Sequence, residues 1–252
     1  MGRLILLGVA VDPLTIPELN ALVSKAVDSG DRFVIANHNL HSIYLWRRDA
    51  RMRAFYTKAG AIHIDGMALV IWSRLLGYPV RRDQRVTYVD WIRPLMGEAS
   101  RRGWRVFHLG SRQGIGDRAS EILRTEFPGL QIRSRHGYFD SEGKENEEIL
   151  REIADDQPHI LLVGMGMPRQ EHWILTNLER LTANAILTSG ACFDFLAGAI
   201  PTPPRWIARL GQEWLYRLYS EPRRLWRRYL VEPWYLLPEM MSDLKRHSRR
   251  RT

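Results

Sequence analysis

The chain contains one cysteine, Cys192, and no hydrophobic run that reaches the length of a membrane-spanning helix. A single cysteine excludes an internal disulfide framework and suits a reducing compartment, so we expect a cytosolic protein. The apolar stretch at residues 5–11 is too short to span a bilayer and lacks the small-residue cleavage pattern of a signal peptide. We interpret residues 3–11 as a buried first strand.

Several catalytic motifs are also absent. No Gly-x-Ser-x-Gly occurs, and Cys192 has no local signature of a nucleophile, which disfavours a serine hydrolase and a cysteine nucleophile. No Asp-x-Asp occurs either, the pattern with which many sugar-nucleotide enzymes hold a divalent cation. His38 with His41, and His63 beside Asp65, lack a convincing third ligand. We therefore expect neither a metal site nor a cofactor.

Positive charge is concentrated at the C-terminal end. Of the formal net charge of +9, an excess of seven lies in residues 205–252, which hold twelve Lys or Arg against five Asp or Glu. Nucleic acid, an anionic membrane or a phosphate-bearing substrate could attract such a tail. A nucleic-acid binder should spread its charge over a core face, whereas this core is nearly neutral. We therefore expect an anionic membrane surface as a partner, and no nucleic acid.

The tail is also rich in tryptophan and follows a proline-rich hinge, IPTPPRW. Two helical segments are expected, at residues 206–219 and 222–245. Tryptophan mixed with arginine suits a membrane interface, where indole lies at headgroup depth and guanidinium meets lipid phosphate. A helical hairpin packed on the core with a solvated basic face is the open alternative. We place a domain boundary at the hinge, with a core at residues 1–200 and an appendage at 201–252.

The chain has 252 residues, and 45% of them are hydrophobic. Patterns typical of strands and of helices alternate along its core. Thr15 with Glu18 forms a capping-box pattern for a helix to about Asp28. Further helices are expected at 40–58, 67–76, 88–102 and 145–156, with another that follows Gly116 and runs to Phe127, and a mobile loop is expected at 78–87. Strands are expected at 32–36, 61–64, 104–109, 130–135, 160–163 and 185–188. This alternation predicts an α/β fold with a parallel sheet and right-handed crossovers.

The stretch ILLVGMGMPRQEHWI predicts a buried strand, a tight turn and a helix. Gly164 and Gly166 permit backbone conformations that other residues avoid, and such a turn points free amides at a phosphate. Arg169 and Gln170 lie at its rim, although an ordinary strand-to-helix turn would have the same pattern. A second glycine-rich turn at residues 110–116 is a weaker signal, because it lacks the Lys-Ser/Thr of a P-loop.

Other polar residues fall at expected sheet edges. Asp65 follows the strand at 61–64 and precedes a glycine, a position more often occupied by a turn residue than by a catalytic base. The polar residues expected at the edges of the sheet are Asn37, Asn39, Asp65, Arg85, Gln170, Glu171 and Asp194.

Five stretches of the chain carry a resemblance: IDG from Ile64, QRV from Gln84, GMGMPRQEHW from Gly164, GACFDFLAG from Gly190 and GQEWLYRLYSEPRR from Gly211. In this order they resemble the WecG/TagA/CpsF family of bacterial glycosyltransferases. The resemblance implies a Rossmann-like core with a C-terminal helical, membrane-targeting appendage on the inner face of the cell membrane. It implies inverting transfer of a sugar from a UDP- or GDP-linked donor to a polyprenyl-diphosphate-linked sugar, in surface polysaccharide or cell-wall polymer assembly.

Matched by position, Asp65 is the proposed catalytic base, with His63 or Glu171 as the next candidate. The resemblance implies a substrate-binding set of Asn37, Asn39, Arg85, Gly164, Gly166, Arg169, Gln170, Glu171 and Asp194. It implies lipid-diphosphate ligands at Arg217, Arg223, Arg224, Arg227 and Arg228. A carboxylate can remove the acceptor proton, while helix N-termini and arginine meet the charge of the leaving diphosphate without a metal.

The chain departs from the family pattern at four places. Asn37 stands where Thr is common, Arg169 where Lys is usual, Thr87 where Gly follows the Arg-Val pair, and residues 202–204 read Thr-Pro-Pro in place of Arg-Ala-Pro. The first and last lie where substrate is expected, so donor and acceptor identity stay open. A basic nucleic-acid-binding protein and a non-catalytic sugar-nucleotide binder are the alternatives, and homo-oligomerisation is compatible with the sequence.

Overall fold

The computed structural model describes residues 2–202 and 213–248. Its N-terminal segment corrects one prediction, because the single strand expected at residues 3–11 is a hairpin. Strands β1 (Leu4–Leu6) and β2 (Val9–Val11) pair antiparallel around Leu7 and Gly8, whose φ angles are 53° and 82°. Two successive positive φ angles are the backbone requirement of a tight two-residue hairpin turn.

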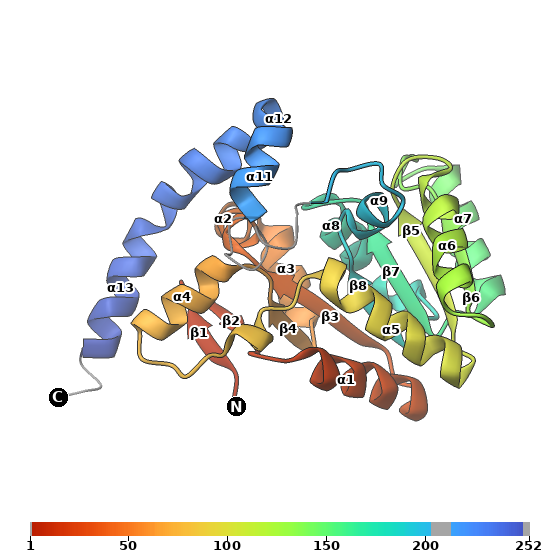
Figure 1. The fold of residues 1–252 in the computed structure, drawn as a ribbon, viewed down its shortest axis with the longest axis horizontal. Coiled ribbons are helices and arrows are strands. Elements are labelled where there is room, and N and C mark those ends of the chain that lie inside the picture. The colour runs from red at the N-terminus through yellow and green to blue at the C-terminus, as the bar shows by residue number, and fades with distance from the viewer. Residues whose placement is uncertain (1, 203–212, 249–252) are drawn as a thin grey trace.

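A six-stranded parallel sheet forms the centre of the molecule and confirms the predicted α/β, Rossmann-like class (Figure 1). The strands lie in the order β4-β3-β8-β7-β5-β6. Their bounds are β3 Phe33–His38, β4 Ala61–Ile64, β5 Arg105–Gly110, β6 Gln131–Arg135, β7 Ile160–Gly164 and β8 Ala185–Thr188. The connections that follow the neighbouring strands β3 and β8 leave the sheet on opposite faces, which opens a crevice between them. Ligands of open α/β sheets bind at such a point.

The helices of the core follow most of the predicted ranges. They are α1 Ile16–Ser29, α2 Leu40–Arg48, α3 Ala50–Lys58, α4 Met67–Leu75, α5 Tyr88–Arg102, α6 Ile115–Glu126, α7 Lys144–Asp156, α8 Arg169–Asn177 and α9 Cys192–Leu196. The single helix expected at residues 40–58 is wrong, since it breaks at Asp49. The Asp49 carboxylate accepts hydrogen bonds from the backbone N–H groups of Arg51 and Met52, and thereby starts α3 as a separate helix.

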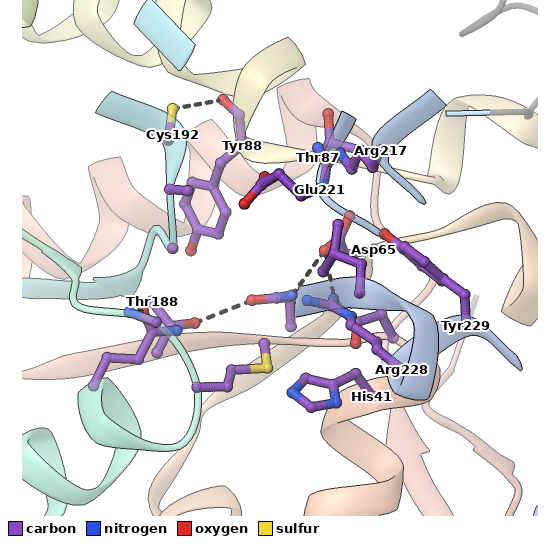
Figure 2. Close-up of a pocket in the computed structure, with 18 of the residues that line it drawn as sticks. His41, Asp65, Thr87, Tyr88, Thr188, Cys192, Arg217, Glu221, Arg228 and Tyr229 are labelled. Atoms are coloured by element: carbon purple, nitrogen blue, oxygen red, sulfur yellow. Dashed lines mark hydrogen bonds between the residues drawn. The ribbon is translucent and has the colours of Figure 1, made fainter. Parts of the chain in front are cut away.

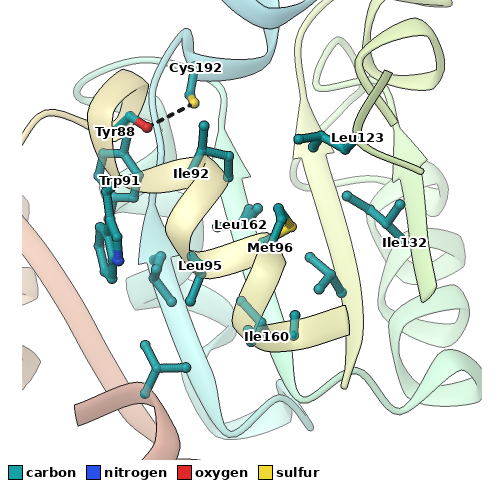
Figure 3. Packing of buried hydrophobic residues seen from close by; sticks show 14 of the residues in the cluster. Tyr88, Trp91, Ile92, Leu95, Met96, Leu123, Ile132, Ile160, Leu162 and Cys192 are labelled. Carbon is teal, nitrogen blue, oxygen red and sulfur yellow. Dashed lines mark hydrogen bonds between the residues drawn. The ribbon is translucent and has the colours of Figure 1, made fainter. Parts of the chain in front are cut away.

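Both faces of the sheet are covered, as expected for a parallel sheet. Ile160 and Leu162 of β7 face a hydrophobic cluster made with α1, α5, α6 and α9 (Figure 3). Leu161 and Val163 of the same strand face a second cluster made with α3, α7 and α8. Alternate strand residues point to opposite faces, so one continuous apolar run fills two layers of core. The sheet is therefore a rigid platform for the residues at its carboxyl edge.

The segment at residues 78–87 is held in place and is not the mobile loop that was expected. It contains a short 3₁₀ helix, η1 (Arg82–Gln84), and the Gln84 side chain is buried. Gln84 accepts a hydrogen bond from the Arg81 N–H and donates one to the carbonyl of Pro13 at 2.6 Å. These bonds tie the segment to the start of the chain.

The described part of the tail is a chain of short helical pieces, not the single second helix expected at 222–245. They are α11 Glu213–Ser220, α12 Pro222–Trp226, a π turn η3 Arg227–Val231, a 3₁₀ turn η4 Glu232–Leu236 and α13 Leu237–Ser248. Pro233 cannot donate to the carbonyl of Tyr229 and its ring would clash there, so the helical register changes. The first half of the helix predicted at 206–219, residues 206–212, lies outside the described residues, and α11 covers the second half.

The tail packs against the hairpin and α4. Leu236 is buried in a third cluster with Leu6, Ile64 and Leu69. The Asp243 carboxylate accepts hydrogen bonds from the Leu7 N–H at 2.6 Å and the Trp72 Nε1–H at 3.0 Å. No helix in the described residues has the length and apolar character needed to cross a membrane. The boundary at residue 201 stays a prediction.

Candidate active site

A cavity of about 600 Å³ lies over the carboxyl ends of β3, β4, β7 and β8 and is bounded on the other side by the tail. Figure 2 shows side chains from the core and the tail pointing into it. From the core it is lined by Asn37, Asn39, Asp65, Thr87, Tyr88, Gly166, Met167, Gln170, Thr188, Ser189 and Gly190, among others. From the tail it is lined by Arg217, Glu221, Leu225, Arg227, Arg228, Tyr229 and Tyr235, among others.

Asp65 follows β4 and is held by two amides. The Nδ2 atoms of Asn37 and Asn39 each donate to Asp65 Oδ2 at 3.2 Å. Each amide is oriented by a bond to its own oxygen: Thr188 Oγ1–H donates to Asn37, and the Ser42 N–H donates to Asn39, the N-cap of α2. The described residues form no hydrogen bond to Asp65 Oδ1. The carboxylate is therefore fixed in orientation and keeps one oxygen for a ligand.

His63 lies within β4, two residues before Asp65, and does not line the cavity. It is fully buried against the rings of Tyr88 and Trp91, and within the described residues neither ring nitrogen has a hydrogen-bond partner. Burial lowers the pKa of His63 to about 4, although the Asp65 charge acts in the opposite direction. A neutral, enclosed imidazole cannot reach an acceptor hydroxyl.

Gln170 and Gly166 form the β7–α8 side of the cavity. Gln170 Oε1 accepts a hydrogen bond from the Gly166 N–H at 3.2 Å, and Gln170 Nε2–H donates to Glu171 Oε1 at 2.8 Å. Glu171 is fully buried behind Gln170, and burial raises its pKa to about 7. The structure therefore places Glu171 where it orients the Gln170 amide, not on the cavity wall.

Four other expected substrate-binding residues lie away from the described cavity lining. Arg169 donates to the carbonyl of Phe139 at 2.6 Å. Asp194 accepts from the Ser111 hydroxyl at 2.9 Å. Gly164 is packed so closely that a Cβ there would lie 2.6 Å from the Gly190 carbonyl oxygen, and Arg85 forms an ion pair with Asp90 at 3.2 Å. The glycine-rich turn at residues 110–116 also lies away from the wall.

Three of the expected lipid-diphosphate arginines reach the cavity. Arg217, Arg227 and Arg228 line it, and Arg217 lies over the ring of Phe195, 4.8 Å from its centroid. Burial lowers the pKa of Arg228, whereas the Tyr229 and Asp65 side chains act to raise it. Arg223 is exposed and lies off the described lining, and the Arg224 side chain lies outside the described part of the chain.

Comparison with known proteins identifies the family of this chain. Residues 4–250 match the family described as Glycosyl transferase WecG/TagA/CpsF family. The chain belongs to this glycosyltransferase family. The resemblance predicted from the five motifs is confirmed, and the protein is a hexosyltransferase.

Relatives of known name within the WecG/TagA/CpsF family support the assignment. An N-acetylglucosaminyldiphosphoundecaprenol N-acetyl-beta-D-mannosaminyltransferase of Bacillus spizizenii is 30% identical over 75% of this chain and 71% of its own length. The protein of the same name in Bacillus subtilis is 30% identical over 71% and 68%, respectively. A Staphylococcus aureus protein of that name is 28% identical over 68% and 65%.

The structure adds cavity residues of this WecG/TagA/CpsF protein that sequence reasoning missed. Thr188 is the last residue of a predicted strand and Ser189 directly follows it, and that position was the available signal. Glu221 lies within the tail motif and lines the cavity beside the arginines. His41 lines it too, and its Nδ1 lies 2.6 Å from Glu232 Oε2, which joins α2 to the tail.

His38 and His41, three residues apart in sequence, have different partners. His38 Nδ1 lies 2.9 Å from Ser42 Oγ, whereas His41 pairs with Glu232. Across residues 2–202 and 213–248, no three His, Cys, Asp or Glu side chains are grouped as a metal site. Metal-independent transfer in this family member stays a prediction.

Proposed function

We propose that this glycosyltransferase moves a sugar from a nucleotide-sugar donor to a polyprenyl-diphosphate-linked sugar, with inversion, in surface polysaccharide or cell-wall polymer assembly. The relatives named above support an N-acetylhexosamine as donated sugar and N-acetylglucosaminyldiphosphoundecaprenol as acceptor. UDP and GDP are both candidates for the donor's nucleotide.

The observation that carries the proposal is the position of Asp65 at the meeting point of the sheet edge and the tail. Asp65 Oδ2 is occupied by Asn37 and Asn39, which leaves Oδ1 to accept the proton of an acceptor hydroxyl. The freed oxygen then attacks the anomeric carbon from the face opposite the nucleotide diphosphate. The bond from that carbon to the diphosphate breaks as the new bond forms, which inverts the configuration.

The sheet edge is suited to the donor. The start of α8 and the turn at residues 189–191 face the cavity. The Gly166 N–H is already bonded to Gln170 Oε1, but the α8 dipole and the other backbone N–H groups of these turns can meet the growing charge of the leaving diphosphate. Gln170, Thr188 and Ser189 supply neutral hydrogen-bonding groups for sugar or ribose hydroxyls. A fixed set of dipoles of this kind stabilises developing charge without reorganisation.

The tail is suited to the acceptor. Arg217, Arg227 and Arg228 approach Asp65 from the opposite side and can hold a lipid-linked diphosphate. A sugar attached to that diphosphate would then present its hydroxyl to Asp65. The same cavity would thus hold both substrates, with the carboxylate between them.

Tail side chains also support attachment to the inner face of the membrane. Trp234, Leu237, Met241 and Leu244 are exposed apolar residues spaced along η4 and α13, and Lys245 and Arg246 follow them. Indole and aliphatic groups favour the headgroup boundary, while each cation near an anionic surface contributes roughly 1 kcal/mol.

Incubation with a panel of nucleotide sugars and defined lipid-diphosphate sugars tests the proposal. We expect one donor to give a lipid-linked disaccharide whose new bond has the inverted anomeric configuration by NMR. No product with any donor, or a product of retained configuration, would refute it.

A further inference from the structure

A second cavity, of about 330 Å³, opens beside the first and is mainly apolar. The residues that line only this second cavity come from the start of α2, the start of α4 and the tail, and they are Leu40, Gly66, Met67, Ala68, Leu69, Ile71, Trp214 and Pro233. We refer to it as the α4 groove.

The α4 groove and the catalytic cavity share their polar junction. The residues that line both are Asn39, His41, Asp65, Thr87, Arg217, Arg228 and Tyr229. A ligand could therefore extend from Asp65 past the two arginines into the groove without crossing the protein surface.

We propose that the α4 groove binds the first isoprene units of the polyprenyl chain of the acceptor. This inference rests on the proposed function, and it assigns a lipid subsite to residues that the proposed reaction does not use. The occupant must carry a diphosphate next to a hydrocarbon chain, because two guanidinium groups lie at the inner end of an apolar channel. A polyprenyl diphosphate has this order of groups.

The exposure of the groove walls supports an occupant of this kind. Ile71 is 52% exposed and Trp214 is 40% exposed, so apolar surface is left uncovered by the described chain. Leu75, one turn further along α4, is also exposed and continues the apolar face outward. Burying each methylene contributes ~0.8 kcal/mol, which is roughly fourfold in affinity, so even two buried methylenes exceed tenfold.

A substitution at Ala68 tests the proposal without disturbing the core. Ala68 is exposed in the first turn of α4 and lines the groove, so Ala68→Trp fills the groove from its mouth. Ala50 is its matched control, since it is exposed in the first turn of α3, another nine-residue helix, and lines neither cavity. Circular dichroism of both variants checks that they fold alike.

Isothermal titration of the full chain with geranylgeranyl diphosphate and with inorganic diphosphate gives the readout. We expect the prenyl compound to bind the wild type and Ala50→Trp at least about tenfold more tightly than inorganic diphosphate. In Ala68→Trp this preference should fall to about twofold or less. The proposal would be overturned if the wild type bound the two probes equally well. It would also be overturned if Ala50→Trp and Ala68→Trp lost the preference for the prenyl compound to the same extent.

Two further measurements distinguish a failure of the groove proposal from a failure of the proposed function. Displacement of the prenyl compound by equimolar lysophosphatidylglycerol would assign the groove to membrane lipid and overturn the proposal. In the transfer assay, Ala68→Trp should raise the KM for a long-chain acceptor and leave the kcat and the donor KM unchanged. Binding of the prenyl probe needs no turnover, so failure of the groove and failure of the transferase assignment give different results.

Discussion

Replacing Asp243 with alanine should loosen the tail and weaken acceptor use. The Asp243 carboxylate is buried and accepts hydrogen bonds from the Leu7 N–H and the Trp72 Nε1–H, donors that lie 236 and 171 residues away in sequence. Leaving a buried donor without a partner costs ~1–3 kcal/mol, so two such donors cost about 2–6 kcal/mol. For a chain of this size each kcal/mol lowers the Tm by roughly 2–4 °C. We therefore expect Asp243→Ala to melt at least about 4 °C below the wild type.

The same change should act on catalysis through the tail. Because α13 continues from the turns that carry Arg228, undocking it should move that guanidinium away from Asp65. We expect a higher KM for the lipid-linked acceptor and an unchanged Kd for the donor nucleotide. Asp155→Ala is a suitable control, since Asp155 is exposed on α7. An Asp243→Ala protein with wild-type Tm and wild-type acceptor KM would refute this account of docking.

Three other predictions follow from the described residues. Transfer should survive EDTA, and loss of activity that manganese or magnesium restores would contradict the metal-independent mechanism. Burial raises the pKa of Glu171 to about 7 from 4.5, so the folded state binds this proton more tightly than the unfolded chain. Wild-type stability should therefore fall relative to Glu171→Gln as pH rises from about 4.5 through about 7, by about 3 kcal/mol in total, and parallel urea-unfolding profiles of the two proteins would refute it. Trp234→Gln with Met241→Gln should remove the part of anionic-liposome binding that resists high salt, and unchanged sedimentation at high salt would rule out their insertion.

The sheet and its edge could be predicted because they depend on local patterns. Short runs of apolar residues predicted most of the six strands, and the residues that follow each strand, such as Asn39 and Asp65, had to lie at one edge of a parallel sheet. The direction in which each side chain points was not predictable in the same way. Arg169 lies beside Gln170 in sequence, yet it turns to the Phe139 carbonyl while Gln170 faces the cavity.

Other features could not be predicted because they depend on contacts between residues far apart in sequence. The hairpin turn at Leu7 is supported by Asp243, and no pattern within residues 3–11 contains that information. The break at Asp49 had a local signal, an aspartate within a helical pattern, which competes with the helix by capping the next one. The glycines at residues 110–116 resembled a phosphate-binding turn, but Gly116 serves packing, because a Cβ there would lie 1.9 Å from the Ser134 hydroxyl.

The most direct test of the proposed chemistry is the single-turnover rate of Asp65→Asn with saturating donor and acceptor. Asparagine keeps the shape of the side chain but cannot accept the proton of the acceptor hydroxyl. A positioned general base contributes ~10²–10⁴-fold, so transfer should slow by about that factor while the donor Kd stays at the wild-type value. A transfer rate near that of the wild type would contradict the assignment of Asp65 as the base.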